Sequence, residues 1–323
     1  MENFSGLTPE ERARLLDLEK SVELDKARPK IKKDFLSFVK YVWPEFIEGS
    51  HHKKINKKFN DLASGKIKRL IINMPPRHTK SEFASYLLPA WMIGRNPKLK
   101  IIQATHTADL AVDFGRKTKN LVDDFEYQQV FDTRLMEDSQ AAGKWKTEQG
   151  GEYFAAGVGG AITGRGADLL IIDDPHKEQD IKKDSKSFDK AWNWYTSGPR
   201  QRLQPGGRIV CVMTRWSVKD LTGQLIKAQG EDDSDQWEIV ELPAILPSGK
   251  PVWPEYWEIK ELEKTKASIP VSNWNAQYMQ QPTAEEGAII KRDWWRDWEH
   301  KEPPRIKYTC LLYTSPSPRD FQV

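Results

Sequence analysis

Cysteine is nearly absent from this sequence. Only Cys211 and Cys310 occur in 323 residues, which is too few for a disulfide framework or a cysteine-rich metal site. Apolar runs are also short. None approaches the ~18 residues that a membrane-spanning helix needs, and the charged first residues lack the apolar core of a signal peptide. We therefore expect a protein of the cytoplasm without membrane contact.

An excess of charge of one sign is missing as well. The chain has 50 Lys and Arg residues against 47 Asp and Glu residues, a net charge of +3. Any surface for nucleic acid must therefore be local. Residues 53–69 and the pair Lys182-Lys183 are the basic runs. Contact with DNA phosphates is one interpretation of them, and a solvated face is the other.

Histidine is scarce and scattered. Six histidines are present, and His51-His52 is the only pair. Because no third ligand lies nearby in the sequence, we interpret this pair as surface or loop residues and not as metal ligands.

Short apolar segments alternate with helical patterns between residues 49 and 243. The apolar segments are continuous runs, which is typical of strands covered by helices on both faces. We predict an α/β domain over residues 49–243 with a mostly parallel sheet flanked by helices. The predicted strands are Ile67–Met74, Leu99–Thr105, Glu152–Ala156, Asp168–Ile172, Arg208–Met213 and Trp237–Leu242. The predicted helices are Ser81–Ile93, which Pro89 should kink or end, Ala108–Val122, Asp184–Tyr195 and Val218–Gln229.

The sequence pattern differs on the two sides of this central part. Residues 1–48 predict a helical N-terminal segment, with helices over 8–27 and 31–47 and a break at Pro44. Residues 244–305 are rich in Trp and Pro and predict an irregular extension that leads toward a further domain.

The stretch LIINMPPRHTKSEF, which starts at Leu70, lacks glycine but ends like a phosphate-binding loop. Such a loop needs a buried strand, a tight turn, a lysine for phosphate charge, a Ser or Thr for Mg²⁺, and a helix whose N-terminus favours anions. An ordinary strand-to-helix turn with Ser81 near its N-cap is the alternative. The candidate nucleotide-binding residues are Pro76, Arg77, His78, Thr79, Lys80 and Ser81.

Two aspartates follow the buried strand in DLLIIDDPHK. Asp173 and Asp174 would be costly at that position unless a cation or hydrogen-bond donors compensate them. In a P-loop ATPase the first acid at such a strand end serves Mg²⁺, and the second orients the attacking water. A helix-capping Asp followed by a turn is the alternative, and it explains one aspartate better than two.

Two further elements belong to the same pattern. Thr214 in VMTRW leaves an apolar strand at its carboxyl end, where a hydroxyl can sense the γ-phosphate; an ordinary strand end is the alternative. Arg165 is the only cation in the glycine-rich loop GGAITGRGAD. An arginine finger is one interpretation of Arg165. Contact with DNA phosphate, or flexibility alone, is the other.

Taken in order, PPRHTKSE, GVGGAITGRGADLLIIDDP and VMTRWSVKDL resemble the large terminase subunit of tailed bacteriophages. HHKKINKKFNDLASGKIKRLIINMPPR and WNAQYMQQPTAEEGAII extend the resemblance, which covers residues 30–305. Members of that family package DNA into an empty capsid. They pair an N-terminal P-loop ATPase of the ASCE, RecA-like type with a C-terminal RNase-H-like nuclease.

The resemblance implies a role for each motif residue. Lys80 and Ser81 would hold the β- and γ-phosphates and Mg²⁺, and Arg77 would reach the γ-phosphate. Thr79 departs from the family, which usually has glycine there. We expect its Cβ to restrict the loop or to force a negative φ.

The later motifs would supply the catalytic groups. Asp173 would be the acid on the Mg²⁺ side and Asp174 the catalytic carboxylate. Thr214 matches the motif that couples hydrolysis to motion, and Arg165 matches an arginine proposed to act on a neighbouring subunit. The implied cofactors are ATP and Mg²⁺. The implied partners are double-stranded DNA, the portal protein, the small terminase subunit and further copies of the chain in a ring on the portal, in the host cytoplasm.

The family's nuclease should begin near residues 306–308, but the sequence there reads IKYTCLLYTSPSPRDFQV. Its prolines exclude a central strand. From residue 311 it resembles a translated sequencing adapter, so we interpret residues 311–323 as non-native and assign no nuclease residues.

We expect an ATP-hydrolysing packaging motor. A helicase-like DNA-dependent ATPase is one alternative, although residues after 243 offer no second RecA-like lobe. A non-catalytic module that binds DNA or the portal, with a decayed nucleotide site, is the other.

Overall fold

A computed structural model describes residues 8–162, 164–177 and 187–283 of the chain. The predicted tail (306–323), most of the loop after the paired aspartates, Lys182-Lys183 and the last part of the extension lie outside these residues.

An eight-stranded sheet forms the centre of the described part, in the order β3-β4-β5-β2-β6-β7-β1-β8. The five neighbouring pairs from β5 to β8 are all parallel, and β3, β4 and β5 pair antiparallel at one edge. This arrangement confirms the prediction of a mostly parallel α/β sheet. The strands are β1 (Arg69–Asn73), β2 (Lys100–Thr105), β3 (Leu135–Ala141), β4 (Lys144–Thr147), β5 (Glu152–Gly157), β6 (Ala167–Asp173), β7 (Leu203–Met213) and β8 (Glu238–Glu241).

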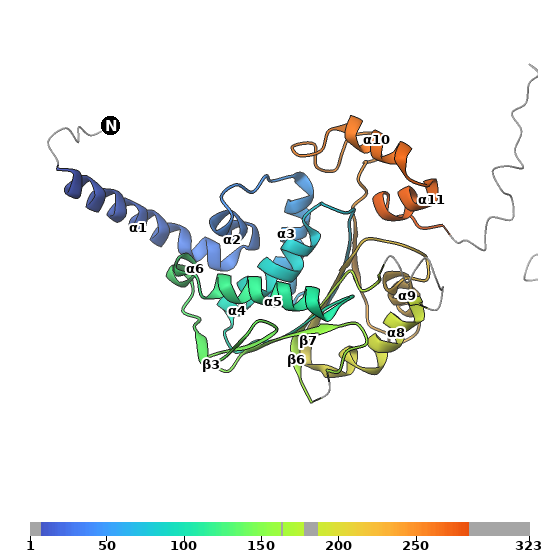
Figure 1. Cartoon of the computed structure of the whole chain (residues 1–323), viewed down its shortest axis with the longest axis horizontal. Coiled ribbons are helices and arrows are strands. Elements are labelled where there is room, and N and C mark those ends of the chain that lie inside the picture. Colours follow the sequence, from blue (N-terminus) through green and yellow to red (C-terminus); the bar gives the residue numbers. More distant parts are fainter. Residues whose placement is uncertain (1–7, 163, 178–186, 284–323) are drawn as a thin grey trace, which may run out of the picture. The chain divides into compact units, whose positions relative to one another are not determined.

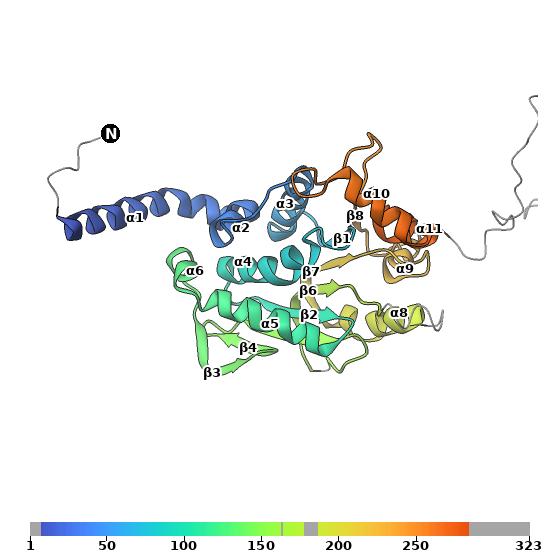
Figure 2. The ribbon, with the colours of Figure 1, turned by 45° about the horizontal axis from the view of Figure 1, so that its top comes forward.

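Helices cover both faces of this sheet, and successive strand residues alternate between the two cores. Leu70 and Ile72 of β1 belong to one apolar cluster, and Ile71 belongs to the other. Figures 1 and 2 show α3, α4 and α5 on one side of the strands and α8 and α9 on the other. The helices before the extension are α1 (Pro9–Lys33), α2 (Phe35–Val42), α3 (Ser50–Ala63), the π-helical η1 (Glu82–Leu87), α4 (Leu88–Arg95), α5 (Ala108–Val122), α6 (Phe125–Val130), α8 (Ser187–Ser197), the 3₁₀ turn η2 (Pro199–Arg202) and α9 (Leu221–Ala228).

The N-terminal helices follow the predicted pattern with different boundaries. A capping box of Thr8 and Glu11 opens α1, which continues through Pro29 to Lys33. Asp34 then ends α1 and caps α2 by accepting a hydrogen bond from the Ser37 N–H at 2.8 Å. The second helix ends at Val42, earlier than predicted. Among the described helices, none is long and apolar enough to span a bilayer.

Three parts of the secondary structure differ from the predictions. The helix after the phosphate loop does not end at Pro89. It changes from the π-helical η1 to the α-helical α4 directly before this proline, which lies in the first turn of α4, where no N–H is needed. Helix α3 was not predicted. The antiparallel strands β3 and β4 were not predicted either, because LMEDSQA is mostly polar and KWKT is only four residues long.

The extension after residue 243 is more regular than predicted. It contains α10 (Ile259–Ser268), α11 (Val271–Asn273) and the π-helical η3 (Trp274–Tyr278). Trp274 and Leu262 are buried in a small third apolar cluster with Ala244, and Trp253 joins the main core beside α3. The tryptophans of this segment therefore attach it to the α/β domain.

Candidate functional site

The loop between β1 and η1 has the backbone of a glycine-rich loop without glycine. Arg77 has φ 61° and Thr79 has φ 68°. A negative φ at Thr79 was one of the two expectations for this loop, and the observed positive φ shows that it is wrong. A β-branched residue in the left-handed region is a genuine outlier, which costs roughly 1–3 kcal/mol and persists only where the surroundings impose it.

Lys80 leaves this loop and contacts Asp174, the residue directly after β6. Its Nζ lies 2.7 Å from Oδ2 of Asp174, and its side chain is 9% exposed. Burial alone would lower the pKa of Lys80, but the charges of Asp174 and then Asp173 outweigh burial and raise the pKa. Asp174 is held from the other side by the backbone N–H of Thr214, which donates to Oδ1 at 2.8 Å. The structure thus joins the loop to the carboxyl ends of β6 and β7.

Asp173 is the buried partner of two serines. The hydroxyl of Ser81 donates to Oδ1 at 3.1 Å and that of Ser85 to Oδ2 at 2.7 Å. Gln103 on β2 donates in turn to Ser85 at 2.9 Å. Burial and then the charge of Asp174 raise the pKa of Asp173 to about 7. Ser85 was not among the predicted site residues, although its spacing of four from Ser81 places both on one helix face.

The oxygen atoms of Ser81 and Asp173 fit a magnesium ion bound together with a nucleotide. Mg²⁺ takes oxygen ligands and is usually held by one or two carboxylates plus substrate phosphates. Among the residues that the structure describes, no three His, Cys, Asp or Glu side chains are grouped to hold a metal by themselves. A site of this kind would therefore depend on phosphate oxygens for its remaining ligands.

A pocket of about 620 Å³ opens above these groups, within the size range of small-molecule sites. It is lined by Pro76, Lys80, His106, Thr107, Asp174, His176, Lys177, Thr214, Trp216 and Gln277. His106 and Thr107 were not predicted, yet they follow β2 as the aspartates follow β6, so the rule that ligands bind at the carboxyl ends of strands could have found them. Gln277 comes from the extension, and no local signal marks it.

Arg165 lies near the amino-terminal ends of β5 and β6, at the end of the sheet opposite the pocket. It forms an ion pair with Glu152, the first residue of β5, and lies 3.9 Å from the ring centroid of Phe154. Asp173 ends β6, and the length of that strand separates the two edges by roughly 20 Å. The structure therefore gathers all the predicted site residues near one edge except Arg165. Arg77 belongs to the loop, but its side chain is exposed and does not line the pocket.

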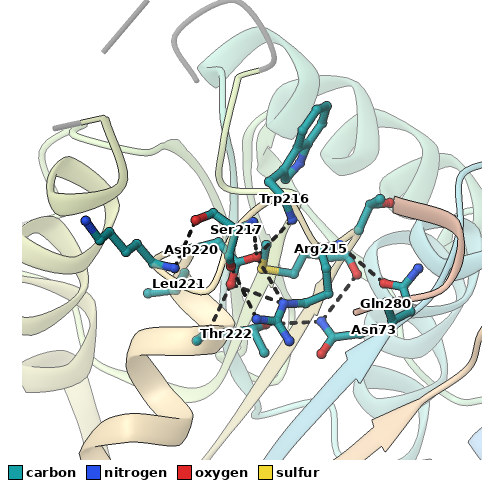
Figure 3. Close-up of polar contacts among 12 residues, drawn as sticks. Asn73, Arg215, Trp216, Ser217, Asp220, Leu221, Thr222 and Gln280 are labelled. Carbon is teal, nitrogen blue, oxygen red and sulfur yellow. Dashed lines mark hydrogen bonds and ion pairs between the residues drawn. The ribbon is translucent and has the colours of Figure 1, made fainter. Parts of the chain in front are cut away.

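A buried ion pair fixes the strand end that carries Thr214 (Figure 3). Nε of Arg215 donates to both oxygens of Asp220, at 3.0 and 3.2 Å, and the two residues are 6% and 0% exposed. Asp220 also accepts hydrogen bonds from the backbone N–H groups of Trp216, Ser217 and Gly223. It therefore caps α9 and closes the loop after Thr214.

The same arginine attaches two other elements. Its Nη1 donates to Glu241 at the end of β8 at 3.4 Å. Its backbone N–H donates to the side-chain oxygen of Gln280 at 3.2 Å, which anchors the extension. Gln280 lies three residues after Gln277, so this bond sets the position of the extension at the pocket.

His51 and His52 are buried, and their predicted place on the surface is wrong. They are 1% and 0% exposed because the first turn of α3 faces the core. The amphipathic spacing of Ile55, Phe59 and Leu62 could have predicted that helix. Burial lowers the pKa of His51 to about 3 and that of His52 to about 2.

The histidine pair lies between the phosphate loop and the extension. Nε2 of His52 is 2.8 Å from the hydroxyl oxygen of Thr79. The ring centroids of His51 and His52 lie 5.4 and 5.0 Å from that of Trp253. His78 of the loop stacks on Trp257 at 5.6 Å, and burial lowers the pKa of His78 to about 4.

No protein-family model matches the chain, and no curated protein matches it. Several solved structures are similar to it. The Thermus phage P74-26 large terminase ATPase domain has a TM-score of 0.49 at 14% identity, over 74% of this chain and 95% of that one. The large terminase of bacteriophage HK97 has a TM-score of 0.49 at 12% identity, over 73% and 51%. The large terminase of a thermophilic bacteriophage, in complex with ADP, has a TM-score of 0.43 at 9% identity, over 69% and 52%. This chain therefore spans about half the length of the last two proteins.

Proposed function

We propose that this chain is the ATP-hydrolysing motor part of a phage DNA-packaging enzyme of the large terminase kind. One observation carries the proposal: Lys80 and Ser81 of the phosphate loop contact Asp174 and Asp173 at the carboxyl edge of the sheet. A lysine, a hydroxyl and two carboxylates in this order are the groups that phosphoryl transfer from ATP requires.

Entry of a nucleotide would change the partner of Lys80. The β- and γ-phosphates compete with Asp174 for the ammonium group, which lies 2.7 Å from the carboxylate. Once Lys80 turns to phosphate, one oxygen of Asp174 is free to accept a hydrogen bond from a water molecule. The other oxygen stays fixed by the Thr214 N–H. Asp174 can then orient that water toward the γ-phosphate.

Ser81 and Asp173 would hold Mg²⁺, which when bound supplies positive charge to the phosphate oxygens. The two serine hydroxyls orient the carboxylate of Asp173 before any ligand arrives. Arg77 would approach the phosphates from the exposed side of the loop.

The packaging role is supported by the motif resemblance. We propose that copies of the chain form a ring on a portal, with double-stranded DNA and a small terminase subunit as partners, in the cytoplasm of the host. Arg165 would act on the nucleotide of a neighbouring copy, because its own pocket lies at the opposite edge of the sheet.

Asp174→Asn tests the catalytic assignment. The amide keeps the shape of the side chain but cannot accept a proton, so we expect the ATP hydrolysis rate to fall by about 10²–10⁴ while nucleotide affinity stays within a few-fold. Phosphate release measures the rate, and titration of a fluorescent ATP analogue with Mg²⁺ measures the affinity.

Asp232→Asn is the matched control, since Asp232 is an exposed carboxylate away from the pocket. Normal hydrolysis by Asp174→Asn would rule out the mechanism. If the unaltered protein shows no affinity up to millimolar ATP, the site is decayed, and a non-catalytic module that binds DNA or the portal is the better function.

A further inference from the structure

Thr79 occupies a backbone conformation that a branched side chain does not choose by itself. Its φ of 68° is the left-handed region, which glycine enters without steric cost. The conformation opens the turn that presents Lys80 and Ser81. Something outside the loop must therefore hold Thr79 there.

The hydrogen bonds around Thr79 have a single consistent direction. The backbone N–H of Gly49 donates to Nδ1 of His52 at 2.8 Å, so that nitrogen carries no proton. A neutral His52 then has its proton on Nε2 and donates it to the Thr79 hydroxyl oxygen, 2.8 Å away. The Thr79 hydroxyl in turn donates a hydrogen bond to the carbonyl oxygen of His78 at 2.5 Å.

His52 cannot easily move away from this contact. Its side chain is fully buried. Its ring centroid lies 4.7 Å from that of Phe46, and 5.0 Å from those of Phe83 and Trp253. The donor is therefore fixed by α3, by η1 and by the extension together.

We propose that His52 is a positioning residue of the phosphate loop, whose hydrogen bond to the Thr79 hydroxyl holds the left-handed turn that glycine would supply by itself. The inference rests on the proposed nucleotide site and assigns to it a residue 27 positions upstream. His52 does not touch the nucleotide. It acts through Thr79.

A double-mutant cycle tests the proposal through nucleotide affinity. His52→Phe keeps an aromatic ring among aromatic neighbours but has no donor. We expect it to weaken binding of a fluorescent ATP analogue with Mg²⁺ on the order of tenfold, the scale of one imposed left-handed residue. In a Thr79→Gly background the same change should alter affinity by less than about twofold, because glycine needs no hydrogen bond to hold the turn.

His51→Phe is the matched control. His51 is equally buried and packs on the same tryptophan, but it makes no hydrogen bond to Thr79, which is paired with His52 instead. We expect His51→Phe to change nucleotide affinity by the same factor with Thr79 intact and in the Thr79→Gly background. Equal losses from His52→Phe in both backgrounds would assign His52 to packing and overturn the proposal, as would unchanged affinity with Thr79 intact.

A second pair decides the question if His52→Phe does not fold. Thr79→Ser keeps the hydroxyl and Thr79→Val keeps the branched shape, so the proposal requires tighter nucleotide binding by the serine variant. Equal affinities would contradict it. If the unaltered protein itself binds no nucleotide, the proposed function fails and this role falls with it; if it binds and the cycle is additive, only the role of His52 is lost.

Discussion

At the scale of single residues, local sequence predicts several residues of the candidate site but not the contact that positions Thr79. Asp173 and Asp174 could be predicted because polar residues directly after a buried strand need partners at that edge. Lys80 and Ser81 could be predicted because they end a loop that joins a buried strand to a helix. The backbone angle of Thr79 could not, since its determining contact is with His52 on α3. The burial of His52 was missed as well, although the apolar spacing of α3 could have predicted it.

Ser85→Ala should destabilise the protein. The hydroxyl is fully buried, donates to Asp173 and accepts from Gln103, so its loss leaves two buried polar groups short of a partner. We expect a decrease of about 1–3 kcal/mol in the free energy of unfolding, measured by urea denaturation. Ser268→Ala removes an exposed hydroxyl and should change stability by less than about 0.5 kcal/mol. Equal effects of the two substitutions would count against a structural role for Ser85.

At the scale of elements, hydrophobic pattern was a good guide to strands with both faces covered and a poor guide elsewhere. The strands β1, β2, β6 and β7 have mostly buried, apolar central residues and were found. Of the hairpin, β3 buries only its first residue, Leu135, and β4 has only four residues, so neither leaves such a pattern. The π-helical η1 was not predicted either, because the apolar pattern of residues 81–93 does not distinguish π-helical from α-helical geometry.

Asp220→Asn should be more damaging than the loss of an ordinary helix cap. Asp220 caps α9 and also compensates the buried charge of Arg215. Removing one member of a buried ion pair costs about 3–5 kcal/mol, which should appear in the free energy of unfolding. Asp124→Asn, at the exposed N-cap of α6, keeps a capping side chain and should cost less than about 1 kcal/mol. Similar costs for the two would show that the ion pair contributes little.

At the scale of the whole molecule, four buried histidines of the described part link folding to pH. The pKa values of His51, His52, His78 and His176 are lowered by burial to between about 2 and about 4. In the unfolded chain these side chains take up protons below their ordinary pKa of 6.5, whereas in the folded protein they remain neutral. Stability is therefore full above pH 6.5 and decreases as the pH falls toward the folded values.

The expected loss is on the order of 2 kcal/mol for each buried histidine at pH 5. Thermal unfolding between pH 8 and pH 5 measures it. His51→Phe should reduce the loss of stability at pH 5 by the contribution of one histidine, about 2 kcal/mol. A melting temperature that does not change below pH 6.5 would exclude buried neutral histidines.

The position of Arg165 predicts complementation between inactive variants. Under the proposed function, Arg165→Ala would keep its own pocket intact but could not serve a neighbouring copy, and Asp174→Asn would have the converse defect. A mixture of the two should regain part of the ATP hydrolysis rate that each lacks alone, because some contacts join a sound pocket to a sound arginine. Each variant alone at the same total protein concentration measures the background. No recovery in the mixture would place the function of Arg165 within its own chain.

The separation of Arg165 from the pocket also has a consequence for symmetry. A twofold contact pairs residue i with j and j with i, so it would bring the arginine of each of two copies to the pocket of the other and then stop. A head-to-tail contact through two different surfaces would instead bring one arginine to one pocket at every interface. Such contacts either close into a ring or continue as a filament. The eight-stranded sheet has Lys80 and Asp174 at the carboxyl ends of its strands and Arg165 at the opposite end, so a head-to-tail ring of the proposed kind would have the same direction around it at every subunit contact.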